Sequence, residues 1–153
     1  MWAPDSLPLT VRSLPVAGLH AEAGKAGAWE IVFVSESTGR ARTYTWSAVE
    51  AEGLHKGVFP GPQETWRAGG AKQPFSPALL KVDTPETLDA AAKSAEAYVN
   101  KPGTRPPVNF MLEYEAGTRF PNPIWRVLWG GSVSSAEYSA AVDATTGKVV
   151  ARD

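Results

Sequence analysis

Alternating apolar residues mark two similar segments of the chain, and each of them begins with a tryptophan. In the first segment, Trp29, Ile31 and Phe33 share one face of an extended strand. The second segment, residues 125–129, repeats the same order of a tryptophan, a charged residue, two aliphatic residues and an aromatic residue. A further apolar segment follows each copy, so the pattern predicts a duplicated antiparallel β-meander.

Helical signals are concentrated between the two copies. Asp83 or Thr84 can cap a helix, Pro85 suits its first turn, and Glu86 lies near the positive end of the helix dipole. Small and apolar residues then recur at helical spacing: Leu88, Ala91, Ala92, Ala95, Tyr98 and Val99. The stretch 100–103 ends this helix, and the slender alanine face favours close packing across the second meander.

The start of the chain carries weaker signals. Residues 7–11 favour an edge strand, and residues 17–26 favour a short helix weakened by Gly18 and Gly24. The turn at residues 37–40 uses Gly39, and residues 41–50 form the return strand, against which residues 54–59 can pair.

These elements predict an α+β fold in which antiparallel meanders carry one main helix, with an internal pseudo-repeat. Residues 1–66 form a first β-rich half, residues 67–77 form a linker, and residues 78–153 form a helix with four strands. We expect the two halves to fuse into one globular unit.

Composition excludes several classes of partner and chemistry. The 15 Lys and Arg residues balance 16 Asp and Glu residues, so no broad positive field is available to hold nucleic acid. The chain has no cysteine, which removes disulfides and thiolate metal sites. No apolar run approaches the roughly 20 residues that span a bilayer, and the chain as given shows no signal peptide.

Candidate catalytic groups are scattered. His20 and His55 lie in unrelated contexts without a metal-binding motif, and we interpret both as solvated. Glu113 and Glu115 share one strand face, which we interpret as an exposed acidic surface. Ser132 lacks the strand and helix of a nucleophile elbow. We therefore predict no catalytic, cofactor-binding or metal-binding residues, and no enzymatic activity.

The hairpin loop at residues 143–147 has one carboxylate, where a calcium loop supplies several oxygen ligands. We predict that Asp143 accepts backbone N–H groups of the turn and that Gly147 has a positive φ angle.

Six tryptophans are many for 153 residues. Four of them lie at apolar strand positions and are predicted to be core residues: Trp29, Trp46, Trp125 and Trp129. Trp2 and Trp66 instead lie in segments rich in proline and glycine, where a tryptophan either covers a core edge or contacts a partner. They are the candidate partner-contact residues.

The second half, residues 75–153, resembles a PepSY-like domain. The resemblance is carried by the capped helix, by the strand Pro123-Ile124-Trp125-Arg126-Val127-Leu128-Trp129, and by the closing hairpin from Val142 to Val149. The first half is similar to a degenerate second copy that keeps the Trp29 strand and the turn at residues 37–39. The resemblance implies a PepSY- or cystatin-like fold and a bacterial protein that is periplasmic, secreted or lipid-anchored.

By the same resemblance, the expected function is that of a non-catalytic, extracytoplasmic binding or regulatory module. Its partner would be a peptidase or another envelope protein, and no cofactor is implied. The alternative is a carrier of a small ligand, held in a cavity that the small alanine side chains leave between helix and sheet.

Overall fold

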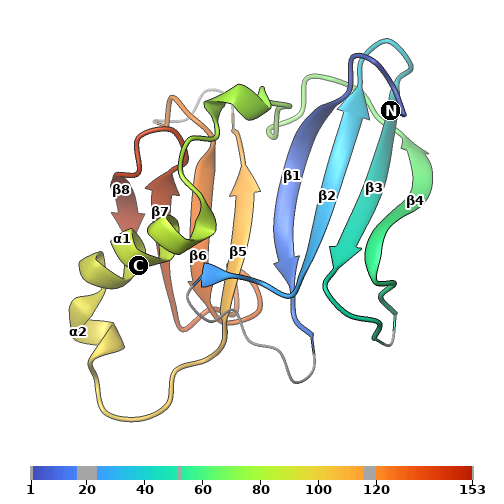
Figure 1. Cartoon of the computed structure of the whole chain (residues 1–153). Helices are drawn as coiled ribbons and strands as arrows, with labels where there is room; N and C mark the ends of the chain where they lie inside the picture. Colours follow the sequence, from blue (N-terminus) through green and yellow to red (C-terminus); the bar gives the residue numbers. More distant parts are fainter. Residues whose placement is uncertain (1, 17–23, 52, 116–119, 153) are drawn as a thin grey trace.

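Eight antiparallel strands form one continuous sheet in the computed structural model, which describes residues 2–16, 24–51, 53–115 and 120–152 (Figure 1). The strands are β1 Leu7–Leu14, β2 Ala28–Ser35, β3 Arg40–Ser47, β4 Gly57–Thr65, β5 Val108–Glu113, β6 Ile124–Trp129, β7 Tyr138–Asp143 and β8 Val149–Arg152. Their order across the sheet is β4-β3-β2-β1-β5-β6-β7-β8. Each half of the sheet is therefore a meander that runs outward from the centre, and β2 and β6 hold equivalent places beside the two central strands.

The two halves meet where β1 pairs with β5. Val11 lies opposite Leu112 at the middle of this short ladder. Next to it, the Ser13 hydroxyl accepts a hydrogen bond from the backbone N–H of Phe110 at 2.8 Å and donates one to Asn109 Oδ1 at 3.2 Å. These bonds satisfy a backbone donor that the junction buries, and they fix the register between the halves.

The α+β fold class predicted from the sequence is wrong. Among the described residues, strands and β-bridges hold 43% and helical turns only 14%, so the architecture is dominated by the sheet. The physical reason is the β1–β5 ladder, which merges the two meanders instead of leaving each one to be covered by its own helix. A continuous sheet replaces the helix-packed α+β arrangement that was expected.

The main helix begins where the sequence predicts. In α1, Thr84–Ser94, the Asp83 carboxylate accepts the backbone N–H of Thr84 at 2.7 Å, and Pro85 occupies the first turn. A short 3-10 turn, η2 Pro77–Leu79, precedes α1, and α2 Glu96–Val99 follows it. Helix α1 lies across β6, β7 and β8 (Figure 1). Ala91 and Ala95 are buried in this interface, because their small side chains let the helix approach the sheet closely.

The core lies under α1 and extends to the centre of the sheet. Its largest members come from β5 and β6 and include Phe110, Leu112, Trp125 and Trp129. Trp29 of β2 packs against this cluster from the other half, with its ring centroid 6.0 Å from that of Trp125 in an edge-to-face arrangement. The two meanders therefore share one core.

Three segments differ from their predicted roles or cannot be compared with them. Strand β1 is central, because it pairs with β5 as well as β2, and is not the predicted edge strand. Most of the helix predicted for residues 17–26 lies outside the described residues. The edge strand β4 begins at Gly57, later than expected, and continues through Pro60 and Pro62 to Thr65. Proline is tolerated there because an edge strand has one unpaired side.

Candidate functional site

One face of the β1–β4 half is apolar and lies beside α1 without being covered by it. Residues that face each other across antiparallel strands point to the same side of a sheet. One such row runs Trp29, Trp46 and Val58, and the next contains Ile31 and Tyr44. Trp46 remains 39% exposed and Val58 70% exposed, so this face has no covering element among the described residues.

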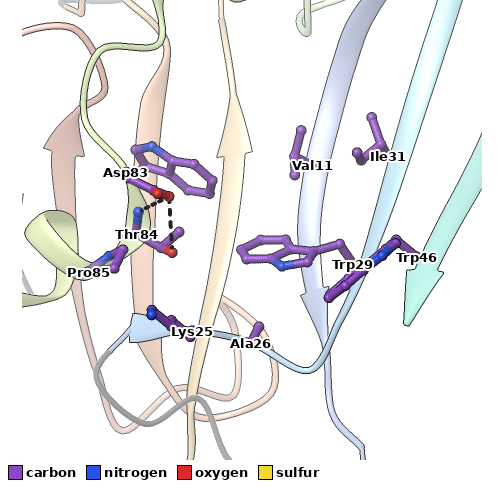
Figure 2. A pocket seen from close by; sticks show the side chains of 10 residues that line it. Val11, Lys25, Ala26, Trp29, Ile31, Trp46, Asp83, Thr84 and Pro85 are labelled. Carbon is purple, nitrogen blue, oxygen red and sulfur yellow. Dashed lines mark hydrogen bonds between the residues drawn. The ribbon is translucent and has the colours of Figure 1, made fainter. Parts of the chain in front are cut away.

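Where this face meets the start of α1, the surface forms an open groove of about 460 Å³. We call it the aromatic groove, and ten residues line it: Val11, Lys25, Ala26, Trp29, Ile31, Trp46, Asp83, Thr84, Pro85 and Trp125. Figure 2 shows the sheet residues on one side of the groove and the residues of the helix start on the other, with the Trp29 ring pointing between them. This volume falls in the range of ordinary ligand sites.

The segment that leads into β2 closes one end of the aromatic groove. Gly24 has a φ angle of 81°, and a Cβ atom at this position would lie 2.6 Å from Pro85 Cα. Only glycine permits so close a backbone approach. This contact holds Lys25 and Ala26 next to the helix start, where both line the groove (Figure 2).

Polar groups of the helix start are already engaged with one another. Asp83 Oδ1 accepts the Thr84 backbone N–H, and the Thr87 hydroxyl donates to the Asp83 carbonyl at 2.8 Å. The Trp125 indole N–H donates to the carbonyl of Val82 at 3.2 Å. The groove wall on the helix side is therefore held by internal hydrogen bonds before any ligand binds.

The prediction that four tryptophans are core residues is correct for two of them. Trp125 and Trp129 are buried, at 7% and 4% exposure. Trp29 is half-buried at the junction, and Trp46 is exposed, so the prediction is wrong for Trp46. The reason is that α1 covers β6–β8, while the equivalent face of β2 and β3 has no helix over it in the part of the chain that the structure describes.

The two candidate partner-contact residues lie away from the aromatic groove. Trp66 is half-buried directly after β4, and its backbone N–H donates to the Gly39 carbonyl at 2.9 Å. Trp2 is half-buried in the N-terminal segment, which Asp5 holds to the turn between β2 and β3 through Ser35 Oγ at 2.6 Å. The structure places neither indole among the groove residues.

The scattered catalytic candidates do not converge. His20 lies outside the described residues. His55 pairs with Glu50 at 3.5 Å and stacks on Phe59 with 4.4 Å between ring centroids. Among the described residues, no group of three or more His, Cys, Asp or Glu side chains could hold a metal ion.

The exposed acidic surface predicted on β5 is wrong for Glu113. Its side chain is only 8% exposed and pairs with Lys72 at 3.2 Å and with Arg126 at 3.9 Å. The chain between β4 and α1 crosses this end of β5, as the bridge between Lys72 and Glu115 shows, and so covers the carboxylate.

Asp143 holds a turn, as the sequence predicts. Its Oδ1 atom accepts the backbone N–H groups of Thr145 and Thr146 at 2.8 and 2.9 Å, and Asn122 donates to the same carboxylate. Burial alone would raise the pKa of Asp143, but these hydrogen bonds to the charged form outweigh it and lower the pKa. Gly147 has a φ angle of 78°, which confirms the predicted left-handed conformation.

Sequence reasoning missed the aromatic groove, although one signal for it was present. Strands β2 and β3 alternate apolar residues on the face that carries Trp29 and Trp46, yet the first half has no amphipathic helix comparable to α1. An apolar face without a covering element marks a candidate interaction surface.

Comparisons with known proteins identify no relative. No family model matches the chain, and neither a curated protein nor a solved structure matches it. Among the described residues, no helix has both the length and the apolar character needed to cross a membrane. The fold and the groove are therefore the basis for a functional proposal.

Proposed function

We propose that this protein is a non-catalytic binding module and that its binding site is the aromatic groove. The observation that carries the proposal is the exposure of Trp46 beside Trp29 in a groove of about 460 Å³. A large aromatic side chain left in contact with water costs hydrophobic free energy that burial against a partner would recover.

A protein segment fits the groove better than an enclosed small ligand. The apolar surface continues from Trp46 to Val58, which lies on the outermost strand, β4. The Val58 side chain is 70% exposed. An extended partner can follow such a surface, whereas small-molecule sites bury most of their ligand. The packing of Ala91 and Ala95 into the core favours this groove over the alternative, a carrier that holds a small ligand between helix and sheet.

The resemblance to PepSY-like domains supports the kind of partner. It favours an extracytoplasmic protein, such as a peptidase or another envelope protein, as the molecule that the module binds. The nearly balanced charge of the chain favours a partner held by apolar contacts over a highly charged one.

Site-specific photo-crosslinking in cells that naturally express the protein tests this proposal. A benzoylphenylalanine at position 46 would lie at the groove, while one at position 45 would lie on the same strand but on the opposite face of the sheet. We expect a discrete crosslinked protein from position 46 and none from position 45. Equal crosslinking from both positions, or none from either, would overturn the proposal.

A further inference from the structure

The aromatic groove holds hydrogen-bond donors that have no partner among the described residues. The indole N–H of Trp29 and that of Trp46 donate to no group among the described residues, and the Lys25 ammonium forms no ion pair there. Trp125 differs, since its indole N–H is bound to the Val82 carbonyl. Within the described part of the chain, the groove therefore offers a ligand two unpaired indole donors and one unpaired cationic donor.

Free acceptors are fewer. Asp83 Oδ1 already accepts the Thr84 backbone N–H at 2.7 Å, and the Val82 carbonyl already accepts the Trp125 indole. Among the side chains that line the groove, this leaves Asp83 Oδ2 and the Thr84 hydroxyl oxygen as the remaining acceptors. A ligand that brought several N–H groups into the groove would leave most of them without acceptors, which costs binding free energy.

We propose that the aromatic groove binds a proline-rich peptide segment in the polyproline II conformation. This inference rests on the proposed function and names the chemistry of its partner. Proline supplies carbonyl acceptors for the indole donors and has no backbone N–H that would need an acceptor. Its rings are compact and apolar, and they pack on the exposed faces of tryptophan side chains.

The shape of the site favours the same ligand. The groove lies between the start of α1 on one side and strands β1–β3 on the other, a shape that suits an extended segment already ordered before binding. A polyproline II helix loses little conformational entropy when it binds, because its dihedral angles are restricted before binding.

Indole resonances provide a direct test. The protein labelled with ¹⁵N is titrated with an acetylated and amidated oligoproline peptide of about six residues, and a glycine-serine peptide of equal length serves as control. We expect the Nε1–H signals of Trp29 and Trp46 to shift, while that of Trp66 stays in place. Shifts with both peptides, or with neither, would overturn the inference.

A pair of variants tests whether the Trp46 indole N–H donates a hydrogen bond to the bound peptide. Trp46→Phe keeps an aromatic ring but removes the indole donor, and it should weaken oligoproline binding about fivefold, as expected for one neutral hydrogen bond. Trp66→Phe makes the same chemical change away from the groove and should leave the affinity unchanged. Equal affinities of the Trp46→Phe variant and the wild type would overturn the inference.

The two proposals can fail separately. If crosslinking from position 46 succeeds but oligoproline does not bind, the groove binds a partner that is not proline-rich. In that case only the inference of a polyproline II ligand is wrong. If neither experiment gives a signal, both proposals are wrong. Concentration-dependent dimerisation that shields the Trp46 indole would also overturn the peptide inference, because a second copy of the chain would then be the occupant.

Discussion

Replacing Trp125 with alanine should lower the free energy of unfolding by about 3–5 kcal/mol. The side chain is 7% exposed and packs edge-to-face on both Trp29 and Phe110, with centroid distances of 6.0 and 6.2 Å. It therefore links β6 to the neighbouring half of the sheet as well as to its own core.

Two contributions make up the expected loss. Removal of a buried aromatic side chain costs its transfer free energy and leaves a cavity, which together account for most of the expected loss. The Val82 carbonyl also loses its indole donor, which is worth about 1 kcal/mol. Because Trp125 borders the aromatic groove, water can reach part of the space that it vacates, which favours the lower half of this range.

Urea unfolding, followed by circular dichroism and analysed by linear extrapolation, measures this loss. Trp66→Ala is the matched control, since it removes the same side chain from a half-buried position outside the core cluster. We expect it to cost less than about 1 kcal/mol, as is usual for changes away from the core. Equal losses in the two variants would refute the division of the tryptophans into core and peripheral residues.

The remaining predictions concern the Asp143 turn and the approach of Gly24 to the helix. Gly147→Val should destabilise the protein by at least about 1 kcal/mol in the same urea assay, because a β-branched residue is strained at a positive φ angle; an unchanged midpoint would contradict this. Hydrogen bonds lower the pKa of the Asp143 carboxyl group in the folded state. The charged carboxylate therefore stabilises the fold fully above about pH 4, near the unfolded-state pKa, and this stabilisation is lost as the pH falls through the lower folded-state pKa. Asp143→Asn should therefore reduce the acid sensitivity of the urea midpoint, and an identical pH profile would rule out this role. Gly24→Ala should cost at least about 1 kcal/mol in thermal or urea unfolding, because its Cβ would meet the Pro85 backbone; wild-type stability would show that the segment can move away. Millimolar Ca²⁺ should leave the melting temperature unchanged, and a rise abolished by Asp143→Ala would reveal a missed metal site.

Local signals predicted the individual elements of the second half well. The start of α1 depends on Asp83 and Pro85, and the closing turn depends on Asp143 and Gly147, so each is determined by side chains within a few positions of the backbone that they stabilise. Strands β6 and β7 were likewise predicted from apolar residues within the strands themselves.

What the sequence could not provide was the pairing between the two halves. Nothing near Val11 in the sequence indicates that it will lie opposite Leu112, so β1 looked like an edge strand and the merging of the halves was missed. The aromatic groove was missed for the same reason. Trp46 looked like a core residue, and only the position of α1 over the other half of the sheet decides that it is exposed.

The strand order also has a consequence for how the chain folds. Within each meander, every strand pairs with its neighbour in sequence, whereas the β1–β5 ladder joins residues such as Ser13 and Asn109, which are 96 positions apart. Contacts of low sequence separation form early, and the central ladder must close a far longer loop. Docking of the two preformed meanders along β1 and β5 should then limit the folding rate, so that substitutions at Ser13 slow folding and those on the outermost strands β4 and β8 mainly speed unfolding.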